Sequence, residues 1–384
     1  MKALVLGATG MYGSEAARLL CSTSSFDEIY IGSRDLSKAS DLAGKLGEKA
    51  TPVLVDLGDL PRLDETVANV NVVVNANGAA LQTALPAIHS AVRMKKNYCD
   101  LSAEADVLLQ AEKHSQEIRA SGITVLLGAG HHPGVLDLLG VKASMALDEL
   151  KSVDMYIAGT LADYADPDTI ISAVDAGWGG TEGLKTIIYS TGADSISVAA
   201  GKRVTLAAGE HQFTVRNPEG IALDFTHWAS MEALSIHRAF PEIDGATISY
   251  GLWPRSGQSA MVRDCARVCA EEMKAAEVIR AMFQQLKVDN TPPPRIQFWA
   301  TATGTRGNKS CTATAYSVED WASNRSILAT TTRGLAFAAE VLARDQIAKK
   351  GLATCPEAFA PDDYFAAVAP EGKVNLCVEV VELI

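Results

Sequence analysis

The feature that most constrains the fold is a glycine-rich loop close to the start of the chain. Residues 2–7 (KALVLG) are a predicted buried strand, and residues 14–20 have the spacing of a helix. Between them the sequence reads Gly7-Ala8-Thr9-Gly10-Met11-Tyr12-Gly13. Gly7 suits a tight turn, Gly10 lets backbone amides approach a pyrophosphate, and Gly13 lets the helix pack closely on the strand. This strand, loop and helix therefore predict a nucleotide site with the helix N-terminus facing the phosphates. The loop residues expected to bind the cofactor are Gly7, Thr9, Gly10, Met11, Tyr12 and Gly13.

Short apolar runs and helical patterns alternate through the first 140 residues. The predicted strands are residues 2–7, 28–33, 51–57, 69–76, 97–102 and 123–130. Helical spacing lies between these strands. One of the expected helices begins after Ser102, which we expect to be its N-cap, and ends at about residue 120. This alternation predicts an α/β fold: a Rossmann-type, doubly wound parallel sheet.

The pattern changes after about residue 150, where predicted strands follow one another closely. They cover residues 152–159, 195–200, 203–208, 221–226, 246–251, 295–304 and 310–317, with hairpin turns expected at 200–203 and 304–308. One long helix is expected from about residue 258 to 288, and another over 326–350, followed by an irregular tail containing Pro356 and Pro361. These elements predict an α+β second domain with a largely antiparallel sheet.

The end of the second strand indicates which dinucleotide is preferred. It reads Ser33-Arg34-Asp35, where an NAD site usually has an acidic residue for the ribose hydroxyls. A hydroxyl followed by a guanidinium suits the 2′-phosphate of NADP, because arginine offers several donors and is always charged. Asp35 leaves NAD open as the alternative. We expect Asp56 and Leu57, at the end of the third strand, to lie near the adenine. We expect Asn75, Asn77 and Gly78, at the end of the fourth strand, to lie near the ribose and pyrophosphate.

Charge and cysteine usage exclude several other classes of protein. The formal charge of −12 argues against binding to nucleic acid or anionic membranes through bulk electrostatics. No apolar run is long enough for a membrane span, so no membrane partner is expected. Seven scattered cysteines form no disulfide framework and indicate a reducing compartment, which predicts a cytoplasmic protein. No Cys or His pair has the spacing of a metal site, and no metal is expected.

Several of these segments together resemble a known family. GATGMYG (7–13), SRD (33–35), VVVNANG (72–78), NYCDLSAE (97–104) and GITVLLGAGHHPGVLDLL (122–139) are similar to the saccharopine dehydrogenase-like oxidoreductases, as is the tail KKGLATCPEAFAPDDYFAAV (349–368). The resemblance implies a Rossmann domain over residues 1–135, a substrate and dimerisation domain over 136–325, and a return to the first domain over 326–384. It further implies a homodimer that reduces imines, or oxidises amines, of amino-acid-derived substrates with NADP or NAD.

Three side chains are candidates for proton handling at the reacting nitrogen. Asp100, inside the family-like NYCDLSAE, has two interpretations: it holds the substrate ammonium or relays its proton, or it satisfies loop amides. His131 and His132 precede Pro133-Gly134, and an imidazole titrates near working pH, so either is a candidate acid or base. Loop packing is the alternative for both, because the family usually has other residues at these two positions.

The remaining candidates are weaker. Asp137 either caps a helix or contacts ligand, and the glycine-rich segment 175–182 either closes over a substrate or is a surface loop. Arg238, Arg255 and Arg263 are candidate partners for a substrate carboxylate, and the spacing does not favour one of them.

Two rival functions remain open. One is an NADP-linked reductase of a ketone or a conjugated alkene, although the Tyr-x-x-x-Lys pair of short-chain dehydrogenases is missing after Tyr189. The other is a sensor that binds the dinucleotide without turnover. Such a sensor would bind NADPH yet leave its absorbance unchanged with every amine and carbonyl mixture.

Overall fold

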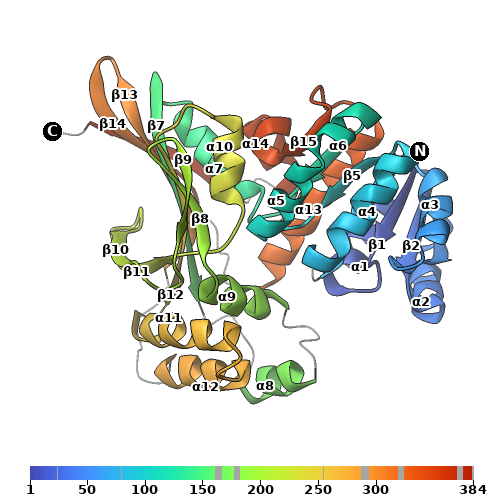
Figure 1. Cartoon of the computed structure of the whole chain (residues 1–384), viewed down its shortest axis with the longest axis horizontal. Helices are drawn as coiled ribbons and strands as arrows, with labels where there is room; N and C mark the ends of the chain where they lie inside the picture. The colour runs from blue at the N-terminus through green and yellow to red at the C-terminus, as the bar shows by residue number, and fades with distance from the viewer. Residues whose placement is uncertain are drawn as a thin grey trace. The chain divides into compact units, whose positions relative to one another are not determined.

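The protein divides into two units in a computed structural model that describes residues 1–23, 25–78, 80–160, 167–176, 182–253, 255–286, 294–318, 324–369 and 375–382 (Figure 1). The first unit contains Met1–Val135 and Ile327–Glu371, and the second contains Leu136–Ser326 and Gly372–Ile384. The chain thus contributes two separate segments to each unit.

A seven-stranded sheet forms the centre of the first unit. Its strands are β1 (Lys2–Leu6), β2 (Glu28–Ser33), β3 (Ala50–Leu54), β4 (Val72–Asn75), β5 (Asn97–Asp100), β6 (Thr124–Leu127) and β15 (Gly351–Thr354). Their order is β15-β6-β5-β4-β1-β2-β3, and every pairing is parallel. The strand order reverses between β1 and β4, which confirms the doubly wound α/β fold, and ligands of such sheets bind at this reversal.

The helices of this unit connect the strands. They are α1 (Met11–Ser22), α2 (Leu36–Leu46), α3 (Leu60–Ala68), α4 (Ala80–Met94), α5 (Ala105–Lys113), α6 (Ser115–Ser121), α13 (Asn324–Ala343), α14 (Cys355–Ala358) and α15 (Pro361–Val368). The single helix expected up to residue 120 is interrupted at His114, and its N-cap residue is Glu104 rather than Ser102. The tail expected to be irregular contains β15, α14 and α15, because Pro356 and Pro361 occupy the first turns of helices, where proline fits.

The second unit is built on a sheet of nine strands. These are β7 (Glu149–Thr160), β8 (Ser195–Ala199), β9 (Lys202–Leu206), β10 (Gln212–Arg216), β11 (Ala222–His227), β12 (Gly245–Trp253), β13 (Phe298–Arg306), β14 (Lys309–Val318) and β16 (Asn375–Glu382). All pairings are antiparallel except that of β7 with β12. The expected α+β arrangement with a largely antiparallel sheet is confirmed.

One expectation about the end of the chain is wrong. Residues 326–384 were expected to return as a whole to the first unit, but β16 pairs with β14 over eight residues in the second unit. The physical reason is that β14 would otherwise be an open sheet edge, and the last strand satisfies its backbone groups.

The helices of the second unit are α7 (Val135–Ser144), α8 (Pro167–Asp175), α9 (Glu182–Gly192), α10 (Glu232–Ala239), α11 (Arg255–Cys269) and α12 (Ala275–Leu286). The single helix expected over 258–288 is therefore two helices. The chain turns between them at Glu271, whose φ of 61° is incompatible with a continuous right-handed helix.

Candidate cofactor and active site

The glycine-rich loop has the geometry of a phosphate cradle. Gly7 has a φ of 71°, in the left-handed region that glycine adopts without strain. Its carbonyl accepts the Gly10 N–H at 3.0 Å, and a Cβ on Gly13 would lie 2.1 Å from the same carbonyl oxygen. The loop can therefore keep this close turn only with glycine at position 13.

The first turn of α1 is open to an anion. Asp35 and Asp59 cap α2 and α3 with their side chains, whereas Gly10 caps α1 without a side-chain bond, and the first turn of α1 contains no acidic residue. A helix end without a side-chain cap or an acidic residue favours an anion, and the residues fit the pyrophosphate of a dinucleotide.

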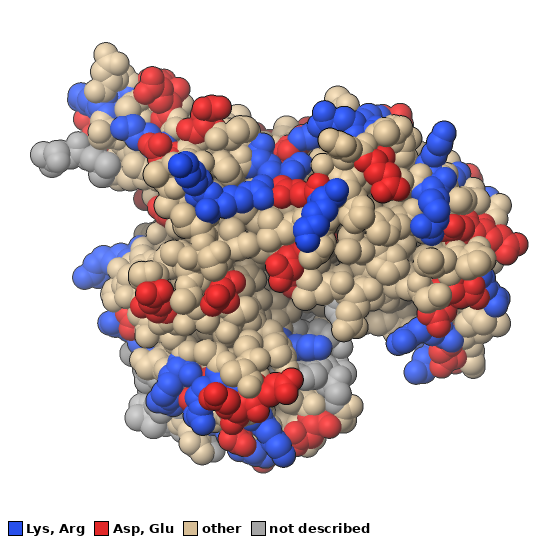
Figure 2. Space-filling view, viewed as in Figure 1, with Lys and Arg blue, Asp and Glu red and all other residues tan. Residues whose placement is uncertain are grey.

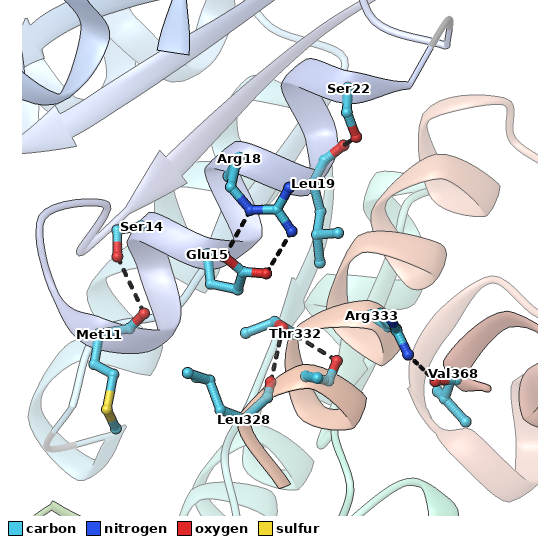
Figure 3. A network of polar contacts seen from close by, with 11 residues as sticks. Met11, Ser14, Glu15, Arg18, Leu19, Ser22, Leu328, Thr332, Arg333 and Val368 are labelled. Carbon is cyan, nitrogen blue, oxygen red and sulfur yellow. Dashed lines mark hydrogen bonds and ion pairs between the residues drawn. The ribbon is translucent and has the colours of Figure 1, made fainter. Parts of the chain in front are cut away.

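The acidic residue nearest to this end is neutralised locally. Glu15 accepts hydrogen bonds from Arg18 at 2.6 and 2.8 Å, as Figure 3 shows, and this partner, with a smaller contribution from Arg333 on α13, lowers the pKa of Glu15. Ser14 bonds back to the Met11 carbonyl at 3.1 Å. The side chains of α1 thus place no unpaired negative charge next to the predicted phosphate site.

The end of β2 meets the glycine-rich loop. The hydroxyls of Thr9 and Ser33 lie 3.2 Å apart, and Arg34 is exposed beside them. Asp35, which left NAD open, is engaged elsewhere: its carboxylate accepts the Lys38 N–H at 3.1 Å as the cap of α2 and lies 3.7 Å from the Lys38 ammonium. A groove of about 260 Å³ beside Thr9 is also lined by Lys38 and Lys45, together with one carboxylate, that of Asp41. This hydroxyl and cation environment suits a 2′-phosphate.

The residues expected near adenine and ribose follow β3 and β4. Leu57 lines an apolar groove of about 510 Å³ together with Leu60, Leu81 and Leu85, whereas Asp56 accepts the Gly58 N–H at 2.9 Å. Asn77 lies directly against the phosphate loop, because a Cβ on Gly7 would be 2.7 Å from its Oδ1. The structure therefore brings Asn77 next to Gly7, and both were expected near the pyrophosphate. Their contact with a cofactor stays a prediction.

Asp100 is at the end of β5 and is only 1% exposed. Its carboxylate accepts hydrogen bonds from the Tyr98 hydroxyl at 3.0 Å, the Ser102 hydroxyl at 2.5 Å, and the backbone N–H groups of Ser102 and Gly128 at 3.1 Å. Burial nevertheless raises its pKa to about 6. These contacts explain why Ser102 does not cap α5, and they fit the interpretation in which Asp100 satisfies loop amides. Its catalytic role stays a prediction.

His131 and His132 lie on the loop after β6. His131 is buried, with Nδ1 3.1 Å from the Thr330 hydroxyl of α13, and the two rings meet edge to face at 5.9 Å. Part of the His132 residue reaches the surface, but its Nδ1 atom is enclosed. Burial lowers the pKa of both rings, that of His132 to about 4. Both are therefore neutral at pH 7, which suits a proton acceptor better than a charged donor.

The other candidates are mostly engaged within the second unit. Asp137 is buried in the first turn of α7 and accepts the Ser235 hydroxyl at 2.9 Å. Arg255 forms two bonds to Asp224 at 2.7 and 2.8 Å, and Arg263 pairs with Asp264 at 2.6 Å, so neither is an open partner for a substrate carboxylate. Within the segment 175–182, residues 177–181 lie outside the described residues.

The sequence did not reveal two residues that contact the predicted site residues. Thr330 is more than 190 residues from His131 along the chain, and no local pattern connects them. Tyr98, in contrast, is two residues from Asp100, and its polar hydroxyl near a buried strand end was a usable signal.

Comparison with known proteins identifies the first unit. Residues 3–126 match the family model described as the saccharopine dehydrogenase NADP binding domain. The N-terminal domain is a saccharopine dehydrogenase NADP-binding domain. Residues 3–126 thus form an NADP-binding domain, which makes the protein an oxidoreductase of the dehydrogenase and reductase class with NADP as its cofactor. The resemblance drawn from the motifs is confirmed for this domain.

Solved structures show how far the fold of this protein is shared. Apo saccharopine dehydrogenase (L-Glu forming) from Saccharomyces cerevisiae is 15% identical and matches with a TM-score of 0.68 over 99% of both chains. Amine dehydrogenase from Mycobacterium smegmatis is 11% identical over 93% of this chain and 95% of that one, with a TM-score of 0.42. Serine dehydrogenase from Escherichia coli is 12% identical over 33% of this chain and 81% of that one, with a TM-score of 0.27. Only the first match is close enough to show a common fold.

Two further properties concern the described part of the chain. None of its helices combines the length and hydropathy needed to cross a membrane, and no three of its His, Cys, Asp or Glu side chains gather as metal ligands. On the face drawn in Figure 2, Lys and Arg side chains are interspersed with Asp and Glu.

Proposed function

We propose that the protein is an NADP(H)-dependent oxidoreductase that acts on the CH–NH bond of an amino-acid-derived amine or imine. One combined observation carries this proposal. Residues 3–126 match the saccharopine dehydrogenase NADP binding domain, and the fold of a saccharopine dehydrogenase matches over 99% of the chain. The likeness therefore includes the second unit as well as the cofactor domain.

The roles of the chain's own residues follow from their positions. The loop from Gly7 to Gly13 would bind the pyrophosphate, and Ser33 with Arg34 would bind the 2′-phosphate. When bound, the nicotinamide ring supplies or accepts the hydride. His131 and His132, neutral at working pH, would accept the proton that leaves the amine during oxidation and return it to nitrogen during reduction.

The residues around Tyr189 give less support to a carbonyl reductase of the short-chain type. Such enzymes protonate the carbonyl oxygen with a Tyr-x-x-x-Lys pair. Tyr189, the nearest approximation, lies on α9 with 41% of its surface exposed, and no lysine follows at the required spacing.

The test is an NADPH oxidation assay with matched substrate mixtures. An amino acid mixed with an oxo acid, or with an aldehyde-bearing amino acid, should deplete NADPH absorbance and give a secondary amine in the mass spectrum. The controls are the same carbonyl compounds without the amino acid, and a conjugated alkene. Turnover of a carbonyl or alkene alone would transfer the assignment to the rival reductase, and NADPH binding without turnover of any mixture would favour the sensor.

The proposal also includes the assembly and the compartment. A homodimer formed through the second unit is expected from the family resemblance, and sedimentation equilibrium of the purified chain tests it directly. Six described cysteines are free, which fits a reducing cytoplasm. Fluorescence microscopy of a tagged chain would check this location.

A further inference from the structure

A row of hydrogen-bonded side chains crosses the carboxyl edge of the first sheet. It connects the ends of β1, β4, β5 and β6, the strands that flank the reversal of strand order. Every member belongs to the first unit, and the row begins at the phosphate loop.

The first part of the row joins the phosphate loop to β4. Asn77 packs on Gly7, as the 2.7 Å approach of its Oδ1 to a Cβ built at that glycine shows. The backbone and side-chain N–H groups of Asn77 both donate to Oδ1 of Asn75, at 3.2 and 2.9 Å. Asn75 is only 3% exposed, so its amide orientation is determined by protein partners rather than by water.

The second part joins β4 to β5 and has a fixed direction. The Nδ2 group of Asn75 donates to the Tyr98 hydroxyl at 2.9 Å, and this hydroxyl lies 3.0 Å from Oδ2 of Asp100. Because the amide is a donor at this point, the Tyr98 proton is directed to the Asp100 carboxylate. Each residue of the row therefore donates to the next, from Asn77 through Asn75 and Tyr98 to Asp100. The last acceptor is the Asp100 carboxyl group, both of whose oxygens accept hydrogen bonds only when the group is ionised.

The third part joins β5 to the loop that carries His131 and His132. Oδ1 of Asp100 accepts the N–H of Gly128 at 3.1 Å, and the Asp100 carbonyl accepts the N–H of Ala129 at 2.8 Å. Gly128 has a φ of 71°, and a Cβ there would lie 2.9 Å from Pro133, so this turn is tightly constrained. One carboxylate thus holds the start of the histidine loop and the end of the row from the phosphate loop.

We propose that Asp100 is a positioning residue that links the phosphate loop to the histidine loop, so that its carboxylate sets how tightly NADPH is held. This role rests on the proposed function only in that the dinucleotide binds at the phosphate loop. It assigns Asp100 no contact with substrate, which agrees with its 1% exposure.

The Asp100 carboxyl group titrates near physiological pH. Burial raises the pKa of Asp100 to about 6, and the bonds from Ser102, Gly128 and Tyr98 oppose that shift without cancelling it. The other titratable groups that face it are Tyr98 and Cys99, whose own pKa values burial raises, so both stay neutral. Above pH 6 the Asp100 carboxylate is ionised and both of its oxygens accept hydrogen bonds. Below pH 6 the carboxyl group carries a proton, so one of the groups that donate to it loses its acceptor.

The test compares NADPH affinity, measured by calorimetry, in three variants. Asp100→Asn replaces Oδ2 by a donor, so Tyr98 and Ser102 lose their acceptor, and Tyr98→Phe interrupts the row while keeping the ring. Asp64→Asn is the control, because this carboxylate of the same unit accepts three bonds from Ser90 and Arg93, outside the row. We expect roughly a fivefold loss of affinity per lost hydrogen bond in the first two variants and an unchanged affinity in the control.

The pH dependence separates positioning from a general loss of structure. The 2′-phosphate of NADPH itself titrates near pH 6, so the quantity to follow is the ratio of wild-type to Asp100→Asn affinity. This ratio should be largest at pH 8 and approach one at pH 5. A ratio that does not vary with pH, or an equal loss in Asp64→Asn, would overturn the proposal. If Asp100→Asn does not fold, the Tyr98→Phe variant is sufficient as a test, because an unchanged NADPH affinity in that variant would overturn the proposal.

The outcome is distinguishable from failure of the proposed function. Turnover of a carbonyl rather than an imine would change the reaction but leave the effect of Asp100 on NADPH affinity as stated. If the wild-type protein binds no NADPH, both the proposed function and the proposed role of Asp100 are wrong.

Discussion

Ser33, Arg34 and Asp35 are consecutive, yet their side chains have different functions. The Ser33 hydroxyl faces Thr9 of the phosphate loop, and the Asp35 carboxylate caps α2. Arg34 is exposed between them and makes no hydrogen bond or ion pair with the described residues of the chain. The ambiguity between NAD and NADP in the sequence came from reading Asp35 as a ligand residue, when its carboxylate is used to begin a helix.

Arg34→Ala should therefore weaken NADPH binding while leaving NADH binding nearly unchanged. Loss of a charged hydrogen-bond donor to the 2′-phosphate corresponds to roughly a 10- to 100-fold rise in the NADPH dissociation constant. Calorimetric titration with both dinucleotides measures this preference. Arg119→Ala, which removes an exposed arginine of α6, is the matched control. An equal loss of affinity for the two dinucleotides would show that Arg34 does not contact the extra phosphate.

The ionisation of Asp100 should lower the stability of the folded chain. Its pKa is about 6 in the fold and about 3.9 in an unfolded chain, so the fold prefers the protonated form. The associated stability is complete below about pH 4 and is lost as the pH rises through 6. We expect wild type to lose about 3 kcal/mol relative to Asp100→Asn between about pH 4 and pH 7.

Urea denaturation of both proteins, followed by circular dichroism at several pH values, measures this difference. A difference in stability that is the same at every pH would contradict the raised pKa. Because the comparison is between two proteins that differ at one site, the titration of all other carboxyl groups cancels.

At the scale of elements, the first unit was more predictable than the second. The first six strands could be located because buried parallel strands are continuous apolar runs separated by helices. The expected helix over 258–288 was wrong because the turn at Glu271 is set by a backbone conformation and not by a glycine or proline that a reader of the sequence would notice. The phosphate loop was predictable because its glycines are required by close backbone contacts, whereas Thr330 and Arg333 of α13 reach the site region only through the fold.

The junction of β1 with α1 should not tolerate a side chain at position 13. A methyl group there would overlap the Gly7 carbonyl, so Gly13→Ala should destabilise the chain by about 1–3 kcal/mol and abolish tight NADPH binding. Gly44→Ala is a matched control within α2, because a Cβ at that position meets nothing within 4 Å. It should stabilise the protein by about 0.5–1 kcal/mol and leave NADPH binding unchanged. Chemical denaturation and calorimetry of both variants test the pair; normal NADPH affinity in Gly13→Ala would contradict the close-packing argument.

At the scale of the whole molecule, each unit is made from two separate segments of chain. Sequence patterns identified the change from alternating to consecutive strands near residue 150, but they misplaced β16. An isolated strand of eight residues has no local property that says which sheet it joins, since pairing is decided by the edge that is left open.

Removal of residues 372–384 should consequently affect the second unit and spare the cofactor domain. All five Trp residues lie between positions 178 and 321, so tryptophan fluorescence reports unfolding of the second unit. The truncated chain should unfold at a lower urea concentration by this probe, while calorimetry should find its NADPH affinity unchanged. A loss of NADPH affinity equal to the loss of stability would indicate that the last strand supports both units.

The late position of β15 affects how the protein is made. This strand completes the first sheet beside β6, yet it is translated more than 200 residues after β6. At typical synthesis rates a nascent chain leaves that backbone edge without its partner for about 10–45 s on the ribosome. During this interval the exposed edge of β6 can pair with another polypeptide, and pairing with β15 removes that hazard.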